Sequence, residues 1–434
     1  MTDSPVQIVP TDRLKSARVP AVQNEDGLKN VWILTGIVVL YGLANGLLQT
    51  TAPQAVLALK FNSQQLGWIG AAIPIGYTMG CLLFGRLFIR VRGKHVLLGG
   101  ILMALASILG VASARHFLSF VTALVGYGLG SAAVWPFASA WMLDFQSEGI
   151  PKSRILRHYN IAWTSGTAAG MYTSGLLCSH KLIFQTFYFS AAMAAVVFVC
   201  ACVPRMARHA IKSMSNAEHA GTPPPISAAA VYTSLPVLLA AVCANLAALG
   251  TRAVIVTNYA ELNSLLKFDA DRMGLFAAAM LLSQLIAFAF GALYEPWLGL
   301  RRVYFFLALA LAATNIAFAT CISLFVLLPA VLLTGIVLAV SFQTGIVAAT
   351  AYFSSSQGGT TFHEAVIGVG GMAPLLFGAI VAALKADGLD AERALRIPFI
   401  YMASSLVLVL TLQLVLISTR VEHRSLANAH QGKR

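Results

Sequence analysis

The feature that most constrains this chain is a series of apolar runs, each about 20 residues long, that follow one another along almost its whole length. A run of about 20 apolar residues forms a helix long enough to cross the hydrocarbon layer of a bilayer, which is about 30 Å thick. Only 10% of the 434 residues are charged, against about 25% in soluble proteins. The chain is therefore predicted to be an all-α membrane protein. This excludes a soluble enzyme, a disordered regulator and a disulfide scaffold.

The apolar runs predict twelve transmembrane helices in two groups of six. The first six are expected at 31–58, 65–88, 95–113, 117–142, 159–179 and 183–203, and the second six at 232–260, 272–294, 302–322, 324–352, 364–385 and 397–419. Between the groups, residues 204–231 contain three consecutive prolines and predict a linker. The predicted domains are thus a tail at 1–30, a six-helix bundle at 31–203, the linker, a second bundle at 232–419 and a tail at 420–434.

The positions of Lys and Arg predict the orientation of the helices across the membrane. Twenty of these residues fall on the side that holds both tails and the linker, and eight fall on the other side. Because cytoplasmic loops carry the excess of Lys and Arg, both tails are expected in the cytoplasm. We expect a multi-pass protein of the cytoplasmic (inner) membrane or the plasma membrane, in contact with its lipids. The same loop residues account for the net charge of +13, so no nucleic-acid partner is expected.

The two groups of helices repeat one another in sequence. LKFNSQQLGWIGAA begins at Leu59 and LKFDADRMGLFAAA begins at Leu266, 207 residues later. Two weaker matches follow in the same order, Gly85 with Gly291 and Asn160 with Glu364. Each group has an even number of spans, so both groups enter the membrane in the same sense. The sequence therefore predicts two parallel repeats related by an axis along the membrane normal.

Twelve spans in two parallel halves, with a basic linker and cytoplasmic tails, resemble the major facilitator superfamily (MFS) of transporters. The loop after the second span, GRLFIRVRGK at 85–94, is similar to that family's signature. Gly85, Leu87 and Arg90 keep their places in it, and Ile89 stands where the family has an acidic residue. The resemblance implies a secondary transporter that works by alternating access rather than an enzyme. We expect a monomer with a small-molecule substrate and with no cofactor, no metal and no catalytic residues.

Arg252 is the residue most informative about the substrate. It lies inside the seventh predicted span, and the repeat matches it with Asn45 in the first span. A guanidinium at membrane depth costs at least ~2.5–3.5 kcal/mol on insertion scales and needs a partner or a wet cavity. The resemblance implies that the first and seventh spans line a central cavity, where Arg252 would bind an anionic group. Two alternatives are that Arg252 reaches the outer surface or pairs with Glu261.

Other polar residues within the spans are candidates for the same cavity. Near mid-helix, on spans that resemble cavity liners, the candidates are Asn45, Gln49, Asn245, Gln284 and Gln343. For each of them the alternative is a hydrogen bond between helices, since the sequence does not give the helical face. No Asp or Glu is expected in mid-membrane. That expectation disfavours an exporter of cationic drugs and leaves no carboxylate to carry protons.

Acidic residues at the predicted cytoplasmic ends of two spans suggest a gate. The resemblance pairs Asp144 with Arg90, and Glu364 with Arg301 and Arg302. Such ion pairs would hold one state and break as the halves rock. The preferred substrate is a small organic or phosphorylated anion. The alternatives are a neutral sugar or amino acid, with Arg252 structural, or a transporter-like protein that serves as a sensor or assembly factor without transporting.

Overall fold

The computed structural model describes residues 25–87, 93–144, 152–202, 235–294, 298, 300–353 and 356–416 of the chain. Within these residues the regular secondary structure is helical. The predicted linker, the C-terminal tail, most of the N-terminal tail and Arg90 lie outside the described residues.

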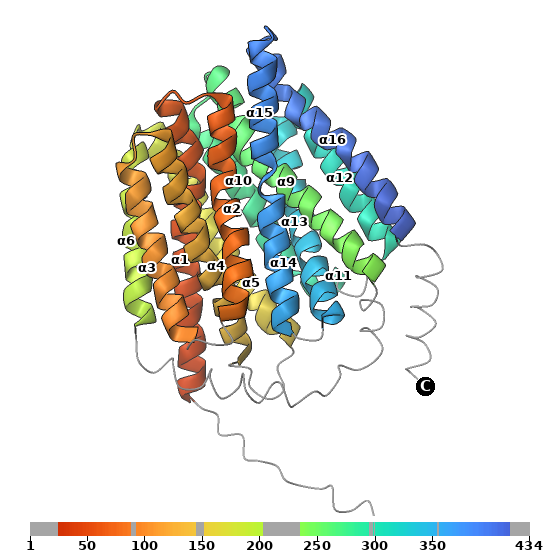
Figure 1. Cartoon of the computed structure of the whole chain (residues 1–434). Helices are drawn as coiled ribbons and strands as arrows, with labels where there is room; N and C mark the ends of the chain where they lie inside the picture. The colour runs from red at the N-terminus through yellow and green to blue at the C-terminus, as the bar shows by residue number, and fades with distance from the viewer. Residues whose placement is uncertain are drawn as a thin grey trace, which may run out of the picture.

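The helices form two groups that follow each other along the chain (Figure 1). The first half of the molecule contains α1 (Glu25–Ala58), α2 (Ser63–Leu87), α3 (Gly93–Ser113), α4 (Phe117–Asp144), α5 (Lys152–Ser179) and α6 (Ile183–Ala201). The second half contains α9 (Leu235–Leu265), α10 (Ala270–Ala289), α11 (Gly291–Tyr294), α12 (Arg301–Thr320), α13 (Leu324–Tyr352), α14 (Ser356–Gly370), α15 (Ala373–Ala386) and α16 (Ala391–Leu416). Each half has a large apolar core of its own.

Eleven spans among the described residues are long and apolar enough to cross a membrane. The fifth predicted span does not meet that criterion, although the structure forms it as α5, a helix of 28 residues. This helix is more polar than its neighbours because Ser, Thr and Gly replace the large apolar side chains. It packs between α1 of its own half and α10 of the other half. Small residues on α5 therefore serve close helix packing instead of contact with lipid.

The eleventh predicted span, 364–385, differs from the structure in two ways. Its helix begins eight residues earlier, at Ser356, and it is interrupted after Gly370. The chain resumes as α15, with Pro374 in its first turn. Two consecutive glycines followed by a proline explain the interruption, because glycine weakens a helix and proline starts a new one. The earlier start places Glu364 two turns inside the helix rather than at its end.

Both ends of the described chain lie at one end of the bundle. In Figure 1, α1 starts at the bottom and the tilted α16 runs downward to its end at the right; we call the end of the bundle where α1 starts and α16 ends the tail end. The far end holds the short turns that join α1 to α2, α5 to α6, α9 to α10 and α15 to α16. Each of these turns has three or four residues, so each joins two neighbouring antiparallel helices.

Four helices stop at the far end in the same way. Lys60, Lys181 and Lys267 have positive φ angles of 59°, 62° and 57°, and Gly388 has φ 85°. At each position the amide bonds the carbonyl three residues earlier, and the next amide bonds the carbonyl five residues earlier, at 2.9 to 3.1 Å. This pattern is the Schellman motif. Lys60 and Lys267 are 207 residues apart, as are Lys181 and Gly388. The internal repeat thus extends to backbone conformation.

The two halves meet most closely through glycines toward the far end. A Cβ atom added to Gly175 of α5 would lie 2.6 Å from the Cα atom of Gly274 in α10. A Cβ added to Gly378 of α15 would lie 2.7 Å from the Cα of Gly67 in α2. Side chains larger than hydrogen do not fit at such distances, so α5 and α10, and likewise α2 and α15, touch backbone to backbone.

A polar contact between the halves accompanies this packing. Lys385 of α15 forms an ion pair with Glu261 of α9 at 2.6 Å. Ser63, the first residue of α2, donates a hydrogen bond to the same Glu261 oxygen at 2.8 Å and accepts one from Lys385 at 3.0 Å. The ion pair lies within the second half, and the serine connects it to the first half. The far end of the interface is thus held by backbone contact and by this three-residue group.

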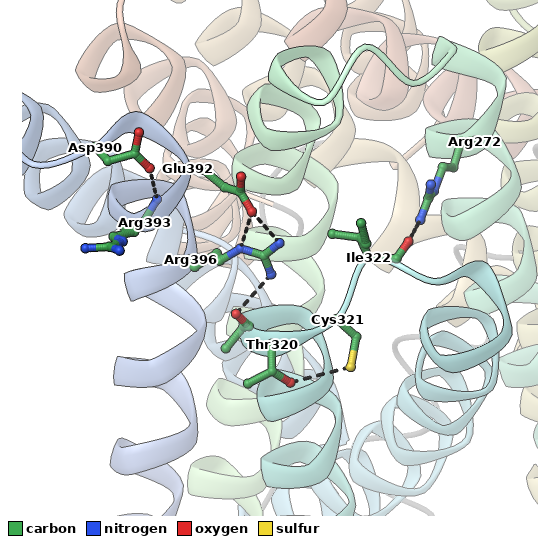
Figure 2. A network of polar contacts seen from close by, with 9 residues as sticks. Arg272, Thr320, Cys321, Ile322, Asp390, Glu392, Arg393 and Arg396 are labelled. Carbon is green, nitrogen blue, oxygen red and sulfur yellow. Dashed lines mark hydrogen bonds and ion pairs between the residues drawn. The ribbon is translucent and has the colours of Figure 1, made fainter.

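A second polar network ties together the far end of the second half (Figure 2). Arg396 of α16 pairs with Glu392 at 2.8 Å and donates to the carbonyl of Ala319 in α12 at 3.0 Å. Arg272 of α10 donates to the carbonyl of Ile322, which follows α12. Both arginines satisfy carbonyls at or beyond the end of α12, where no further helical turn supplies partners. The network therefore links α10, α12 and α16 within one half.

Candidate functional site

A cavity of about 200 Å³ lies between the two halves. Helices α1, α2, α4 and α5 of the first half and α9, α13 and α14 of the second contribute to its wall. A cavity of about 150 Å³ holds a molecule the size of benzene, whereas sites for drug-sized ligands measure about 300–1,000 Å³. The space therefore suits a small solute.

Arg252 lines this cavity from α9 and is half-buried. It donates a hydrogen bond of 3.0 Å to the side-chain oxygen of Gln49 in α1. Gln49 in turn donates to Asn45 at 3.0 Å, and the hydroxyl of Tyr127 donates to the same Asn45 oxygen at 3.1 Å. The guanidinium of the second half is thus held by a row of neutral side chains in the first half.

The predicted alternatives for Arg252 can be compared with this arrangement. Pairing with Glu261 is wrong, because that carboxylate bonds Lys385 and Ser63. Within the described part of the chain, no ion pair engages Arg252. A guanidinium has five N–H donors, and among the described residues Arg252 donates one side-chain hydrogen bond, to Gln49. Asn45 and Arg252, which the repeat relates, line the same cavity.

Glu364 lies in the cavity wall, which corrects two expectations. It is buried, with 6% of its surface exposed, and one carboxylate oxygen accepts a hydrogen bond of 2.7 Å from the hydroxyl of Tyr77 in α2. It therefore does not face Arg301 and Arg302, which begin α12 and do not line the cavity. The expectation of no acidic residue in mid-membrane is also wrong. The reason is the early start of α14, which carries Glu364 into the membrane.

Aromatic side chains form much of the remaining wall. Trp135 of α4 lies with its ring centroid 5.0 Å from that of Tyr41, and 6.4 Å from that of Trp163 in α5. Trp163 also meets Phe342 of α13 at 6.3 Å, across the interface between the halves. Tyr159 lines the cavity beside them and donates to the backbone carbonyl of Trp135 at 3.1 Å. These rings offer apolar and cation-attracting surface to a bound solute.

The remaining predicted binding residues lie away from the cavity. Asn245 is buried and donates to the backbone carbonyls of Ala241 and Ser341 at 2.9 and 2.8 Å. Gln284 is buried, with 3% of its surface exposed, and does not line the cavity. Gln343 is likewise absent from the lining, although its neighbour Phe342 is part of it. For Asn245 the structure favours the alternative of hydrogen bonding between helices, since Ser341 belongs to α13.

The predicted gate at the tail end is only partly described. Asp144 is the last residue of α4, its side chain lies outside the described part of the chain, and so does Arg90. Their pairing stays a prediction. Sequence reasoning missed the role of Tyr77 as the partner of Glu364, and of Trp135, Tyr159 and Trp163 as a group. The sequence alone could not predict that these aromatic side chains come together, because that depends on how α4 and α5 pack against each other.

The cavity combines one cationic and one anionic side chain with neutral amides, hydroxyls and aromatic rings. In the described residues, no cluster of His, Cys, Asp and Glu has the geometry of a metal site. The arrangement can bind a small polar solute between two halves that contribute different side chains to the cavity wall. That is the geometry expected of a site that opens alternately to two sides.

Comparison with solved structures supports this fold. The nucleoside transporter NupG is 14% identical, with a TM-score of 0.69, over 90% of this chain and 99% of that chain. A bacterial homologue of the human lysosomal transporter Spinster, in an inward-facing and unoccupied conformation, is 15% identical, with a TM-score of 0.66, over 93% and 98%. The human organic anion transporter MFSD10 is 16% identical, with a TM-score of 0.59, over 89% and 99%. These identities show a shared fold.

Comparison with curated proteins gives no match. The family model of the Major Facilitator Superfamily, in contrast, matches residues 34–314, from the start of the first span into α12. The match covers more than half of the chain and agrees with the helical membrane fold and its two halves. The protein therefore belongs to the Major Facilitator Superfamily and is a multi-pass membrane transporter rather than an enzyme.

Proposed function

We propose that this protein moves a small organic or phosphorylated anion across the membrane by alternating access, and that Arg252 binds the anionic group. The observation that supports the proposal is the position of Arg252 in the cavity wall, bonded to the neutral amide of Gln49. A guanidinium that has only a neutral partner retains its full positive charge. Its planar set of donors suits a carboxylate or a phosphate.

The proposed orientation places both tails in the cytoplasm and the far end outside. It is supported by the excess of Lys and Arg on the side of the tails. In this orientation, the glycine contacts and the group of Ser63, Glu261 and Lys385 close the outer side of the cavity. Transport then requires these contacts to separate as the halves rock, while contacts at the tail end form.

A second candidate is a neutral sugar or amino acid, with Arg252 serving a structural role. The hydrogen bonds from Arg252 through Gln49 to Asn45 favour this reading, because they give the guanidinium a role in joining the two halves. Among the similar structures, one is a nucleoside transporter, one is an organic anion transporter and another is the fucose:proton symporter of E. coli. The shared fold therefore does not choose between charged and neutral solutes.

The test is a thermal-shift screen of the purified protein in detergent with small carboxylates, phosphate esters, sugars and amino acids. A ligand that binds only the folded state raises its stability by ~2.7 kcal/mol at a hundredfold excess over Kd. One class of anion is expected to stabilise the protein, and Arg252→Gln is expected to weaken its binding by about 10- to 150-fold, because a hydrogen bond to a charged group contributes about 1.5–3 kcal/mol.

The matched control is Arg393→Gln, which removes an exposed arginine at the far end. It is expected to leave the affinity for the anion unchanged. Stabilisation by sugars alone, with the same affinity in Arg252→Gln, would instead establish the second candidate. Uptake of the selected compound into proteoliposomes then measures transport directly, with Arg252→Gln reducing uptake at low substrate concentration.

A further inference from the structure

The cavity holds a second charge that an anion alone does not use. Arg252 comes from α9 and Glu364 from α14, so both charges belong to the second half. Each bonds a neutral side chain of the first half, Gln49 and Tyr77 respectively. Among the described residues, the two charges form no ion pair with each other. An anion bound at Arg252 would leave the carboxylate at membrane depth without a cationic partner, which is unfavourable.

The two charges lie at different heights along the bundle. Gly370 of α14 packs against Leu249 of α9. Arg252 lies three residues beyond Leu249 toward the far end, and Glu364 lies six residues before Gly370 toward the tail end. The difference of nine residues corresponds to about 13.5 Å between the two Cα atoms along the helix axes. Both residues line the same cavity, so a solute that contacts both would carry its opposite charges at different points of its skeleton.

The surroundings of Glu364 favour a cation of the ammonium type. Tyr77, Trp135 and Tyr159 line the cavity on the first-half side. Tyr77 bonds the carboxylate directly, and Trp135 packs against the cluster that contains Tyr77. Aromatic faces combined with a carboxylate are how proteins recognise ammonium groups. The opposite charge at Arg252 suits a carboxylate or phosphate.

We infer that the transported solute is a small zwitterion, with its anionic group at Arg252 and an ammonium group at Glu364 between the aromatic rings. This inference rests on the proposed function, because it keeps Arg252 as the anion site and adds the second charge. The cavity of about 200 Å³ limits the solute to a compact molecule. An α-amino acid, a betaine or a phosphocholine-like compound has the required charges within that size.

The experiment compares matched probes in thermal-shift titrations of the full-length protein. The zwitterions are alanine, leucine, phenylalanine, glycine betaine and phosphocholine. Each amino acid is accompanied by its N-acetyl derivative, which keeps only the carboxylate, and its amide, which keeps only the ammonium group. At least one zwitterion is expected to bind the wild-type protein at least tenfold more tightly than the derivatives of the same skeleton.

The variants assign each charge to its group. Glu364→Gln is expected to remove the preference for the zwitterion over the N-acetyl derivative, and Arg252→Gln to weaken binding of both. Tyr77→Phe keeps the Glu364 carboxylate but removes the hydrogen bond that Tyr77 donates to it. It is therefore expected to reduce the preference for the zwitterion less than Glu364→Gln does. It serves as the second variant if Glu364→Gln does not fold. Asp387→Asn removes an exposed carboxylate at the end of α15 and is expected to leave the preference unchanged.

Three results would overturn the inference. If N-acetyl derivatives bind as tightly as zwitterions and Arg252→Gln weakens them, the inference fails while the proposed anion transporter stands. If no compound with an anionic group binds, both fail together. If Glu364→Gln leaves every affinity unchanged but abolishes uptake driven by a proton gradient, Glu364 handles protons and not the ammonium group.

Discussion

At the residue scale, the binding chemistry of the cavity depends on what Arg252 contacts. Its partner is the amide of Gln49, which donates to Asn45, and the same Asn45 oxygen accepts a hydrogen bond from Tyr127. An amide oxygen accepts a hydrogen bond without neutralising the charge. The side chain is therefore positioned by the first half and still attracts an anion. A carboxylate at the same place would fill the site permanently.

Replacing that amide by a carboxylate tests this argument. Gln49→Glu keeps the shape of the partner, adds a negative charge and removes the N–H donor to Asn45, and the new carboxylate is expected to compete with the solute for the guanidinium. The affinity for the anionic or zwitterionic ligand is expected to fall by at least tenfold, as measured by thermal-shift titration. Gln49→Met is the control, because it has a similar size, no charge and no hydrogen bond.

The control variant separates charge from shape. Since Gln49→Met removes only a neutral competitor for the guanidinium, it is expected to bind the ligand as tightly as the wild type or more tightly. Equal losses of affinity in both variants would contradict the argument, because they would show that Gln49 acts through the shape of the cavity or through contact with the solute.

Half of the predicted binding residues line the cavity, for an identifiable reason. Asn45, Gln49 and Arg252 line the cavity, and they lie on the two spans that the repeat relates. Gln284 and Gln343 do not line it. The position of a residue along its predicted span shows how deep its side chain lies in the membrane. Whether that side chain faces the cavity depends on how the helices pack. Glu364 was misplaced because the start of α14 in a polar, glycine-containing segment could not be read from hydropathy.

At the scale of single elements, the sequence predicted most helices to within a few residues. The predicted 117–142 and 324–352 correspond to α4 (Phe117–Asp144) and α13 (Leu324–Tyr352). The break between α14 and α15 was not predicted, since the apolar run continues through it. Its consequence is local: the glycines at the break allow α14 to approach Pro74 of α2, with Gly371 and Pro74 in the cavity wall.

The turns at the far end offer a test of backbone strain. Lys267 has φ 57°, and a residue with a Cβ atom in this conformation costs roughly 1–2 kcal/mol. Glycine removes that cost but loses about 0.5–1 kcal/mol of conformational entropy. Lys267→Gly is therefore expected to melt about 1 to 3 °C above Lys267→Ala, which removes the same charge but keeps the Cβ.

The measurement is thermal unfolding of both variants in the same detergent. Lys60→Gly and Lys60→Ala repeat the comparison at the equivalent turn of the first half, where φ is 59°. The two turns are distant in the sequence and belong to different halves, so their effects are expected to add. An alanine variant that melts at or above its glycine counterpart would show that the left-handed turn is not strained.

At the scale of the whole molecule, the two halves are built as separate bodies. Each half has its own core, and the arginine network at the far end joins three helices of the second half (Figure 2). Between the halves, the contacts include glycine pairs, a serine, polar groups of the cavity and two small apolar clusters around Met171 and Phe288. These clusters are much smaller than either core, so separating the halves is expected to be less unfavourable than opening a core.

We expect the glycine pairs to control the balance between the open and closed states of the far end. Gly175→Ala introduces a methyl group 2.6 Å from the Cα atom of Gly274, and overpacking of this kind costs about 1–3 kcal/mol. The cost applies only when the far end is closed, because the helices carrying these glycines separate when it opens. The ratio of open to closed molecules is therefore expected to rise about 5- to 150-fold. Gly378→Ala is expected to act in the same direction at the contact between α15 and α2.

Distance measurements between spin labels at Gln64 of α2 and Ser264 of α9 detect this shift. Both positions are exposed at the far end and belong to different halves. The labels are placed in a background without the six native cysteines. Gly175→Ala is expected to increase the population at longer distances. Gly99→Ala, where an added Cβ meets no atom within 4 Å, is expected to leave the distribution unchanged. If Gly175→Ala leaves the distances unchanged as well, the contact between α5 and α10 persists in both states and acts as a pivot for the halves instead of a gate.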